Sequence, residues 1–107
     1  RAIFTERVDG KMTFRRGFSL RKGERVLIVE DIVTTGGSIK EVIDVVKAAG
    51  AVPVAVSMLV DRSGGKATFG DVPATALLTM DVETYTPEHC PLCAKGIPMT
   101  KRGRTGK

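Results

Sequence analysis

The segment from Val26 to Ser38, VLIVEDIVTTGGS, constrains the fold of this chain more than any other. It opens with four consecutive apolar residues without alternation, which is typical of a parallel strand covered on both faces. It continues through an acidic pair, Glu30 and Asp31, into a turn rich in threonine and glycine. These features predict a buried strand that ends at two carboxylates and leads into a loop that opens a helix.

A helix and a second strand are expected after this segment. Apolar residues recur at helical spacing over 39–49, and Ser38 with Glu41 has the spacing of a capping box. Gly50 is the expected residue that closes the helix. Residues 52–60 are again apolar and β-branched. Strand, helix and strand in this order predict a right-handed crossover with parallel strands, and so an α/β fold.

The flanking segments are shorter and more polar. Residues 2–5 and 11–15 are expected to pair as extended strands around a turn at 7–10, because Asp-Gly is a strong hairpin signal. A polar loop over 61–66 follows the second strand of the crossover, and residues 76–80 predict one more short strand.

The positive charge of the chain comes from its carboxyl terminus. The 107 residues carry 17 Lys or Arg against 12 Asp or Glu, a net charge of +5. Residues 95–107 hold five of the basic residues and no acidic one, which leaves residues 1–94 neutral. The length allows one domain, and no apolar stretch approaches the roughly 18 residues that a membrane-spanning helix needs. We therefore expect one domain over 1–94 with a solvated basic tail, without a membrane partner and without nucleic acid.

The two cysteines, Cys90 and Cys93, lie in the run HCPLC, which begins with the only histidine, His89. One C-x2-C supplies two of the four ligands of a tetrahedral zinc site, so a metal would need a second chain. The same spacing occurs in redox pairs, although Pro87 and Pro91 indicate a turn-rich segment here. Structural thiols, a metal shared between chains and a redox pair all stay open. Two cysteines do not suggest a disulfide framework, which favours an intracellular setting.

The acidic pair and the loop after it predict a sugar-phosphate site. Open α/β sheets bind ligands at the carboxyl ends of their strands, and a helix amino terminus attracts anions. Consecutive glycines let the backbone approach a phosphate closely, while ribose hydroxyls can donate hydrogen bonds to Glu30 and Asp31. The alternative is a simple turn with solvated carboxylates. The run VLIVED also resembles a response-regulator receiver strand, with Asp61 as the aspartate, but TTGG lies where a receiver helix would begin.

The residues Glu30–Ser38, EDIVTTGGS, resemble the phosphoribosyl pyrophosphate (PRPP) motif of type I phosphoribosyltransferases. Three further segments, AIFTERVDGKMTFRRGF, LVDRSGG and CPLCAKGIP, resemble the bacterial orotate phosphoribosyltransferase family. The resemblance covers essentially all 107 residues. It implies a Rossmann-like parallel-sheet fold with a PRPP-binding βαβ unit over 26–60. It also implies that the amino-terminal half of that fold is missing, so that residues 1–94 form a partial core.

The resemblance implies an activity, which is the transfer of the phosphoribosyl group of PRPP to orotate. The products are orotidine 5′-monophosphate and pyrophosphate, in UMP biosynthesis, by a cytoplasmic homodimer. Mg²⁺ is expected to bind through PRPP and pyrophosphate, without metal ligands from the chain. Thr34 and Arg62 match positions that contact orotate, although Arg62 could instead pair with Asp61 or Asp31. The motif assigns PRPP binding to nine consecutive residues: Glu30, Asp31, Ile32, Val33, Thr34, Thr35, Gly36, Gly37 and Ser38.

The family's mobile loop corresponds to residues 4–11, within a hairpin and connection over 1–25. Arg7 and Lys11 are its candidates for contact with pyrophosphate, or else ordinary solvated charges on a hairpin. We expect the chain alone to be weakly active or inactive. Two alternatives remain, a purine-type phosphoribosyltransferase and a non-catalytic nucleotide-sensing or RNA-binding module on the same fold.

Overall fold

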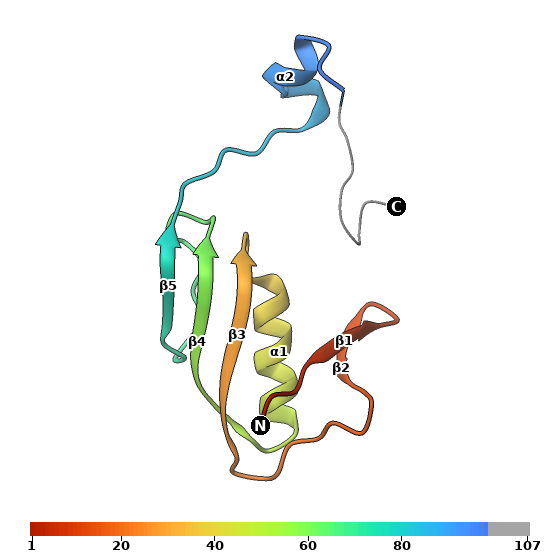
Figure 1. Cartoon of the computed structure of the whole chain (residues 1–107), viewed down its shortest axis with the longest axis vertical. Helices are drawn as coiled ribbons and strands as arrows, with labels where there is room; N and C mark the ends of the chain where they lie inside the picture. The colour runs from red at the N-terminus through yellow and green to blue at the C-terminus, as the bar shows by residue number, and fades with distance from the viewer. Residues whose placement is uncertain (99–107) are drawn as a thin grey trace.

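The centre of the fold is a three-stranded parallel sheet with one helix packed on it (Figure 1). The computed structural model describes residues 1–98 of the chain. The strands lie in the order β3 (Arg25–Val33), β4 (Val52–Asp61) and β5 (Ala74–Thr79), and both neighbouring pairs are parallel. Helix α1 (Gly37–Ala48) connects β3 to β4. The predicted α/β class and the parallel βαβ crossover are confirmed.

The hydrophobic core lies between α1 and one face of the sheet. The helix buries Ile39, Ile43 and Val46, whose spacing follows the predicted helical period. The sheet and its connecting loops add seven buried apolar residues: Ile28, Val33, Ala51, Val56, Met58, Phe69 and Val72. Full burial of one large apolar side chain contributes roughly 1.5–3 kcal/mol, so this layer is the main source of stability.

Helix α1 begins differently from the prediction. Its N-cap is Gly36, at φ 85°, and no side chain caps the helix. Ser38 therefore lies inside the first turn, and the predicted capping box with Glu41 is wrong. The reason is that the left-handed Gly36 starts the helix at Gly37, two residues earlier than a serine cap would allow.

The end of α1 is as predicted. Gly50 adopts φ 81° just after the helix. Its N–H donates to the carbonyl of Lys47 at 3.0 Å, and the N–H of Ala51 donates to the carbonyl of Val46 at 3.1 Å. This pair of hydrogen bonds is the Schellman arrangement, which turns the chain directly into β4.

Strand β3 is longer than predicted. Glu30 and Asp31 lie within it, because Ile32 and Val33 continue the ladder beside the last residues of β4. The prediction that the strand ends at the acidic pair is therefore wrong, because β3 continues beyond Asp31 to Val33. The acidic pair still lies near the carboxyl edge of the sheet, next to the start of α1.

The second face of the sheet is open in residues 1–98. Four large apolar side chains on the three strands are exposed: Leu27 by 56%, Val29 by 70%, Leu59 by 55% and Leu77 by 83%. The prediction of a strand covered on both faces is thus wrong for the described part of the chain. Among residues 1–98 the one helix that packs on this sheet is α1, on the other face, and β3 is an edge strand.

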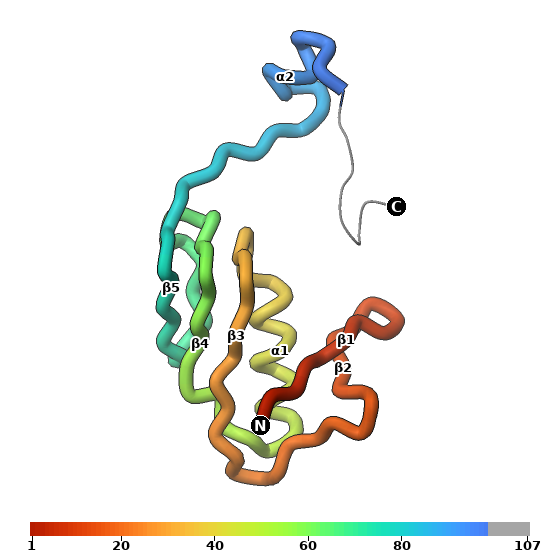
Figure 2. Tube along the Cα trace, viewed as in Figure 1, coloured from red at the N-terminus to blue at the C-terminus, as the bar shows by residue number. Residues whose placement is uncertain are grey.

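An antiparallel hairpin, β1 (Thr5–Val8) and β2 (Lys11–Phe14), precedes the sheet. Its turn consists of Asp9 and Gly10 alone, at φ 51° and 78°, which is typical of a type I′ turn. The first strand therefore begins at Thr5, whereas the sequence placed it at residues 2–5. Figure 2 shows the hairpin beside α1, outside the sheet.

After β5, which begins two residues before the predicted strand 76–80, the chain leaves the sheet as an extended arm (Figure 2). The arm ends in two short helical turns, η1 (Pro87–His89) and α2 (Pro91–Ala94). Most of the predicted basic tail, residues 99–107, lies outside the described residues. In residues 1–98 no helix combines the length and apolar character that a bilayer crossing requires.

Candidate functional site

The turn between β3 and α1 encloses a small polar cavity, hereafter the β3–α1 cavity. Its volume is about 80 Å³, the space of two or three water molecules. It is lined by Glu30 and residues 32–39, so the structure gathers every residue of the predicted PRPP motif around it except Asp31. Ser38 and Ile39 belong to the first turn of α1, where backbone N–H groups lack acceptors within the helix. Such a cavity suits an anionic group of phosphate size.

Gly36 is the residue that this loop can least replace. Its φ of 85° is a left-handed conformation, and a Cβ built on it would lie 2.9 Å from Cε1 of Phe69. Phe69 is only 5% exposed, so its ring has little room to retreat. The same Cβ would lie 3.4 Å from Cβ of Ala67. The loop after β4, which carries Ala67 and Phe69, therefore packs against the β3–α1 turn at Gly36.

The pKa values of the two carboxylates of the acidic pair shift in opposite directions. Partial burial, with a hydrogen bond to Asp31, raises the pKa of Glu30 above its usual value. The hydrogen bond with Glu30, followed by one from the N–H of Ile32, lowers the pKa of Asp31. The latter bond joins the Ile32 nitrogen to Asp31 Oδ1 at 2.7 Å. The lowered pKa favours the ionised form of Asp31, and the carboxylate oxygens of the pair can accept hydrogen bonds from hydroxyl groups.

Asp31 lies outside the β3–α1 cavity and lines a separate hollow on the open face of the sheet. That hollow has a volume of about 450 Å³. Glu30 lines both spaces and so lies between the β3–α1 cavity and this hollow. A ligand that begins in the β3–α1 cavity and extends over the sheet edge would meet Glu30 first and Asp31 next.

A third pocket, hereafter the Arg62 pocket, lies beyond the carboxyl ends of β3 and β4. It has a volume of about 310 Å³. Thr34 and Arg62, the two residues that the resemblance assigned to orotate, both line it. Lys66 lines it as well, a basic residue that the sequence reasoning did not single out. Its place after the Ser-Gly-Gly turn of the same loop could have identified it.

Arg62 is held by its backbone, and its side chain is available for a ligand. Its N–H donates to the carbonyl of Val33 at 2.7 Å. Among residues 1–98 its guanidinium forms neither of the ion pairs that the sequence allowed, with Asp61 or with Asp31. That alternative is wrong because the Asp61 carboxylate is already occupied.

Asp61 is a structural residue of this loop. It is 6% exposed and is the only buried polar or charged residue of the described chain. Its Oδ1 accepts the Ser63 N–H at 2.9 Å and the Ser63 hydroxyl at 2.6 Å. The hydroxyl oxygen of Ser63 in turn accepts the N–H of Ala67 at 2.9 Å. These bonds lower the pKa of Asp61 and fix the backbone on both sides of Arg62.

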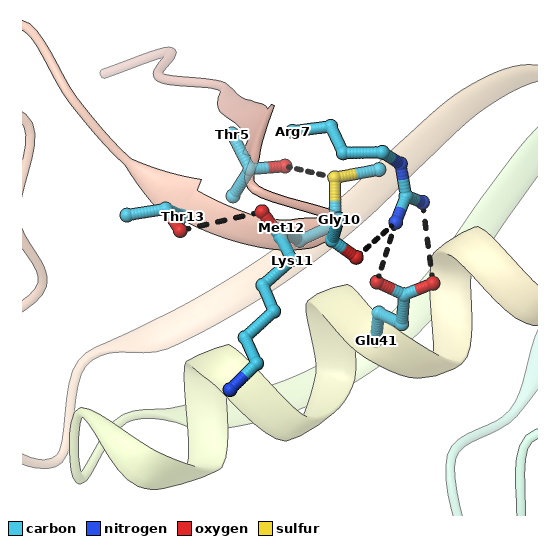
Figure 3. Close-up of polar contacts among 7 residues, drawn as sticks. All are labelled: Thr5, Arg7, Gly10, Lys11, Met12, Thr13 and Glu41. Carbon is cyan, nitrogen blue, oxygen red and sulfur yellow. Dashed lines mark hydrogen bonds and ion pairs between the residues drawn. The ribbon is translucent and has the colours of Figure 1, made fainter.

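The structure does not bring Arg7 and Lys11 to the β3–α1 cavity. Figure 3 shows the Arg7 guanidinium facing Glu41 of α1, with two hydrogen bonds of 3.0 and 3.2 Å and a third of 2.8 Å to the carbonyl of Gly10. In the view of Figure 3 the side chain of Lys11 extends from the hairpin across the ribbon of α1, away from the Arg7–Glu41 pair. Neither residue lines the cavity in this conformation.

A preformed metal cluster is not part of this site. No three or more His, Cys, Asp or Glu residues converge on a common point in residues 1–98. The oxygen donors of Glu30 and Asp31 nevertheless suit Mg²⁺, which typically takes one or two carboxylates and completes its shell with phosphate oxygens and water.

Comparison with known proteins identifies similar chains. The family model of the phosphoribosyl transferase domain matches residues 3–71. An orotate phosphoribosyltransferase of Desulforamulus reducens is 59% identical over 103 residues, which are 96% of this chain and 53% of that protein. The proteins of the same name from Caldicellulosiruptor saccharolyticus and Thermotoga maritima are 55% and 54% identical, over 96% and 99% of this chain. The chain spans about half the length of these curated relatives, 53% and 56% for the last two.

Proposed function

This chain belongs to the phosphoribosyltransferase family, and we propose that it serves the transfer of the phosphoribosyl group from PRPP to orotate. One observation carries the proposal: the β3–α1 cavity and the Arg62 pocket share Thr34 and Thr35 as a common wall. A phosphate-binding space and a cationic pocket are thus adjacent, as a reaction between a sugar phosphate and an anionic base requires. The names of the similar proteins support orotate as that base.

PRPP would place its 5′-phosphate in the β3–α1 cavity, against the free amides of α1. The ribose hydroxyls would then donate hydrogen bonds to Glu30 and Asp31. In the transfer, the bond between the anomeric carbon and the pyrophosphate oxygen breaks, and pyrophosphate leaves with the electron pair. The ring nitrogen of orotate supplies the electron pair of the new bond to that carbon and releases its proton to solvent. Positive charge grows on the ribose meanwhile, and the ionised Asp31 favours it electrostatically, so no protein nucleophile is needed.

Orotate would occupy the Arg62 pocket. Its carboxylate is planar and anionic, and a guanidinium binds such a group through two parallel hydrogen bonds. Lys66 adds a second positive charge in the same pocket. A purine base carries no carboxylate, so two basic side chains in this pocket favour orotate over the purine-type alternative.

Mg²⁺ would enter with PRPP, held by the oxygens of PRPP and of pyrophosphate. When bound, it neutralises charge on the pyrophosphate leaving group. Arg7 and Lys11 remain proposed contacts for pyrophosphate. The exposed ion pair of Arg7 with Glu41 is worth about 1 kcal/mol or less, so a stronger anionic partner can replace it. We further propose a cytoplasmic homodimer, in keeping with the family resemblance.

Calorimetric titration of the chain with PRPP and Mg²⁺ tests this function. We expect binding by the unmodified chain and a loss of roughly tenfold to hundredfold in affinity for Asp31→Asn, which removes a charge-assisted acceptor. The matched control is Asp44→Asn, which removes the same charge from an exposed position on α1, away from all three pockets.

The base pocket needs a separate titration. Arg62→Ala should leave the affinity for PRPP within about twofold and abolish the binding of orotate to the PRPP-loaded chain. A chain that is folded by circular dichroism yet binds no PRPP would contradict the assignment of the β3–α1 cavity. Equal loss of PRPP and orotate binding in Arg62→Ala would contradict the division of the site into two pockets.

A further inference from the structure

The arm after β5 carries two thiols that the proposed function does not use. Cys90 precedes α2 and Cys93 lies inside it, and both are free. The N–H of Cys93 donates to Cys90 Sγ at 3.4 Å. Figure 1 shows α2 standing away from the sheet at the end of the extended arm. Cys93 is exposed and Cys90 is partly exposed.

The two cysteines lie on one turn, with Cys90 as the N-cap of α2 and Cys93 within the helix. The N–H of Cys93 that donates to Cys90 Sγ holds this turn together, and a hydrogen bond to sulfur favours its thiolate form. Thiolates are the form of cysteine that binds metal ions.

A single chain supplies too few ligands to complete a site. A structural zinc ion takes four nitrogen or sulfur ligands in a tetrahedron. His89 is adjacent to Cys90 in sequence, but in residues 1–98 no group of three potential ligands converges. The described structure therefore presents a pair of sulfurs without a third ligand.

We propose that Cys90 and Cys93 form one half of a zinc-type thiolate site and that the same two residues of a second copy of this chain complete it. A two-fold axis through the metal ion would relate the two pairs, which is the symmetry of most homodimers. It would supply the four sulfurs that tetrahedral coordination needs. Leu92 and Ile97 beside the sulfurs are 55% and 50% exposed, and contact between two arms would cover them.

Titration of the reduced 107-residue chain with Zn²⁺, and with Co²⁺ as a spectroscopic substitute, tests this site. We expect one ion per two chains, the sulfur-to-cobalt charge-transfer absorption, and a doubling of the mass in solution that a chelator reverses. Cys93→Ser should abolish all three. His89→Gln is the matched control and should leave the stoichiometry and the mass unchanged. None of these results depends on PRPP binding, which can be measured on the same samples.

Three outcomes would overturn the proposal. One ion per chain without a change in mass would show that one copy supplies all the ligands. Loss of metal binding in His89→Gln would show that the histidine is a ligand, so that the metal is not bound by four sulfurs alone. The third is the absence of metal binding together with the loss of two thiols per chain to an added small-molecule disulfide. That exchange, in which the two thiols become one disulfide and the reagent becomes two thiols, would identify a redox pair instead.

Discussion

The substitution Gly36→Ala tests the packing behind the β3–α1 turn most directly. Two separate penalties act on this residue. A Cβ at φ 85° is strained, which costs about 1–2 kcal/mol for a left-handed conformation. The same Cβ would meet the Phe69 ring at 2.9 Å, and forcing extra volume into a packed region costs about 1–3 kcal/mol.

The lower entropy of the unfolded alanine variant offsets about 0.4–1 kcal/mol of these penalties. The net loss for Gly36→Ala is therefore about 1–4.6 kcal/mol. Gly65→Ala is the control for backbone strain alone, since Gly65 has the same φ of 85° and no atom within 4 Å of its built Cβ. Gly37→Ala is the control for a glycine without positive φ, whose built Cβ would lie 3.5 Å from Thr35 Oγ1.

Urea denaturation at constant pH measures the three free energies of unfolding. We expect Gly36→Ala to lose about 1–3 kcal/mol more than Gly65→Ala, because only the former meets the ring. Gly37→Ala should be neutral or slightly more stable than the unmodified chain. In a Phe69→Leu background the stability lost in Gly36→Ala beyond that lost in Gly65→Ala should become smaller. The part of the loss that comes from backbone strain at residue 36 should remain. Equal losses at Gly36 and Gly65, unchanged by Phe69→Leu, would refute the role assigned to Phe69.

Three further predictions concern the loop after β4 and the hairpin. The folded-state pKa of Asp61 is lowered, so its carboxylate adds stability above its unfolded pKa of about 3.9 that is lost as the pH falls through the folded value. In Asp61→Asn the free energy of unfolding should therefore decrease less steeply with falling pH between roughly pH 5 and pH 2 than in the unmodified chain. An unchanged slope would contradict this assignment. Ser63→Ala should lower the free energy of unfolding by roughly 1–3 kcal/mol in urea denaturation, because it leaves the Ala67 N–H without an acceptor. A decrease of less than about 0.5 kcal/mol would argue against a contribution of this hydrogen bond to stability. Arg7→Ala should cost about 1 kcal/mol or less in low salt, and a double-mutant cycle with Glu41→Ala should lose its coupling energy in about 1 M salt.

The order and type of the central elements followed from the sequence, because local pattern and tertiary role agree there. The apolar run of β3, the helical period of α1 and the β-branched β4 each fit one element only. Gly50 ended the helix as expected, since no other residue type adopts its φ of 81° as easily. Element ends were less predictable: β3 continues past Glu30 because its partner strand extends to Asp61, a fact about pairing that local sequence does not contain.

The candidate site was predictable wherever it is continuous in sequence. Glu30 and residues 32–38 surround one cavity because a strand, a tight turn and a helix follow each other without interruption. The contacts between distant segments were not predictable. The pairing of Arg7 with Glu41, the burial of Phe69 against Gly36 and the place of Lys66 in the Arg62 pocket all depend on how loops cross.

The loop after β4 connects the two ligand pockets mechanically. Asp61 and Ser63 fix the backbone that carries Arg62, and Ser63 also holds the N–H of Ala67. Ala67 lines the Arg62 pocket and packs behind Gly36, the residue that shapes the β3–α1 cavity. A displacement of this loop therefore moves residues that line the Arg62 pocket and residues that pack against Gly36 of the β3–α1 cavity. Asp61 lines none of the three pockets and acts only through this loop. Its conservative replacement should therefore weaken both binding events together, whereas Arg62→Ala should weaken only one.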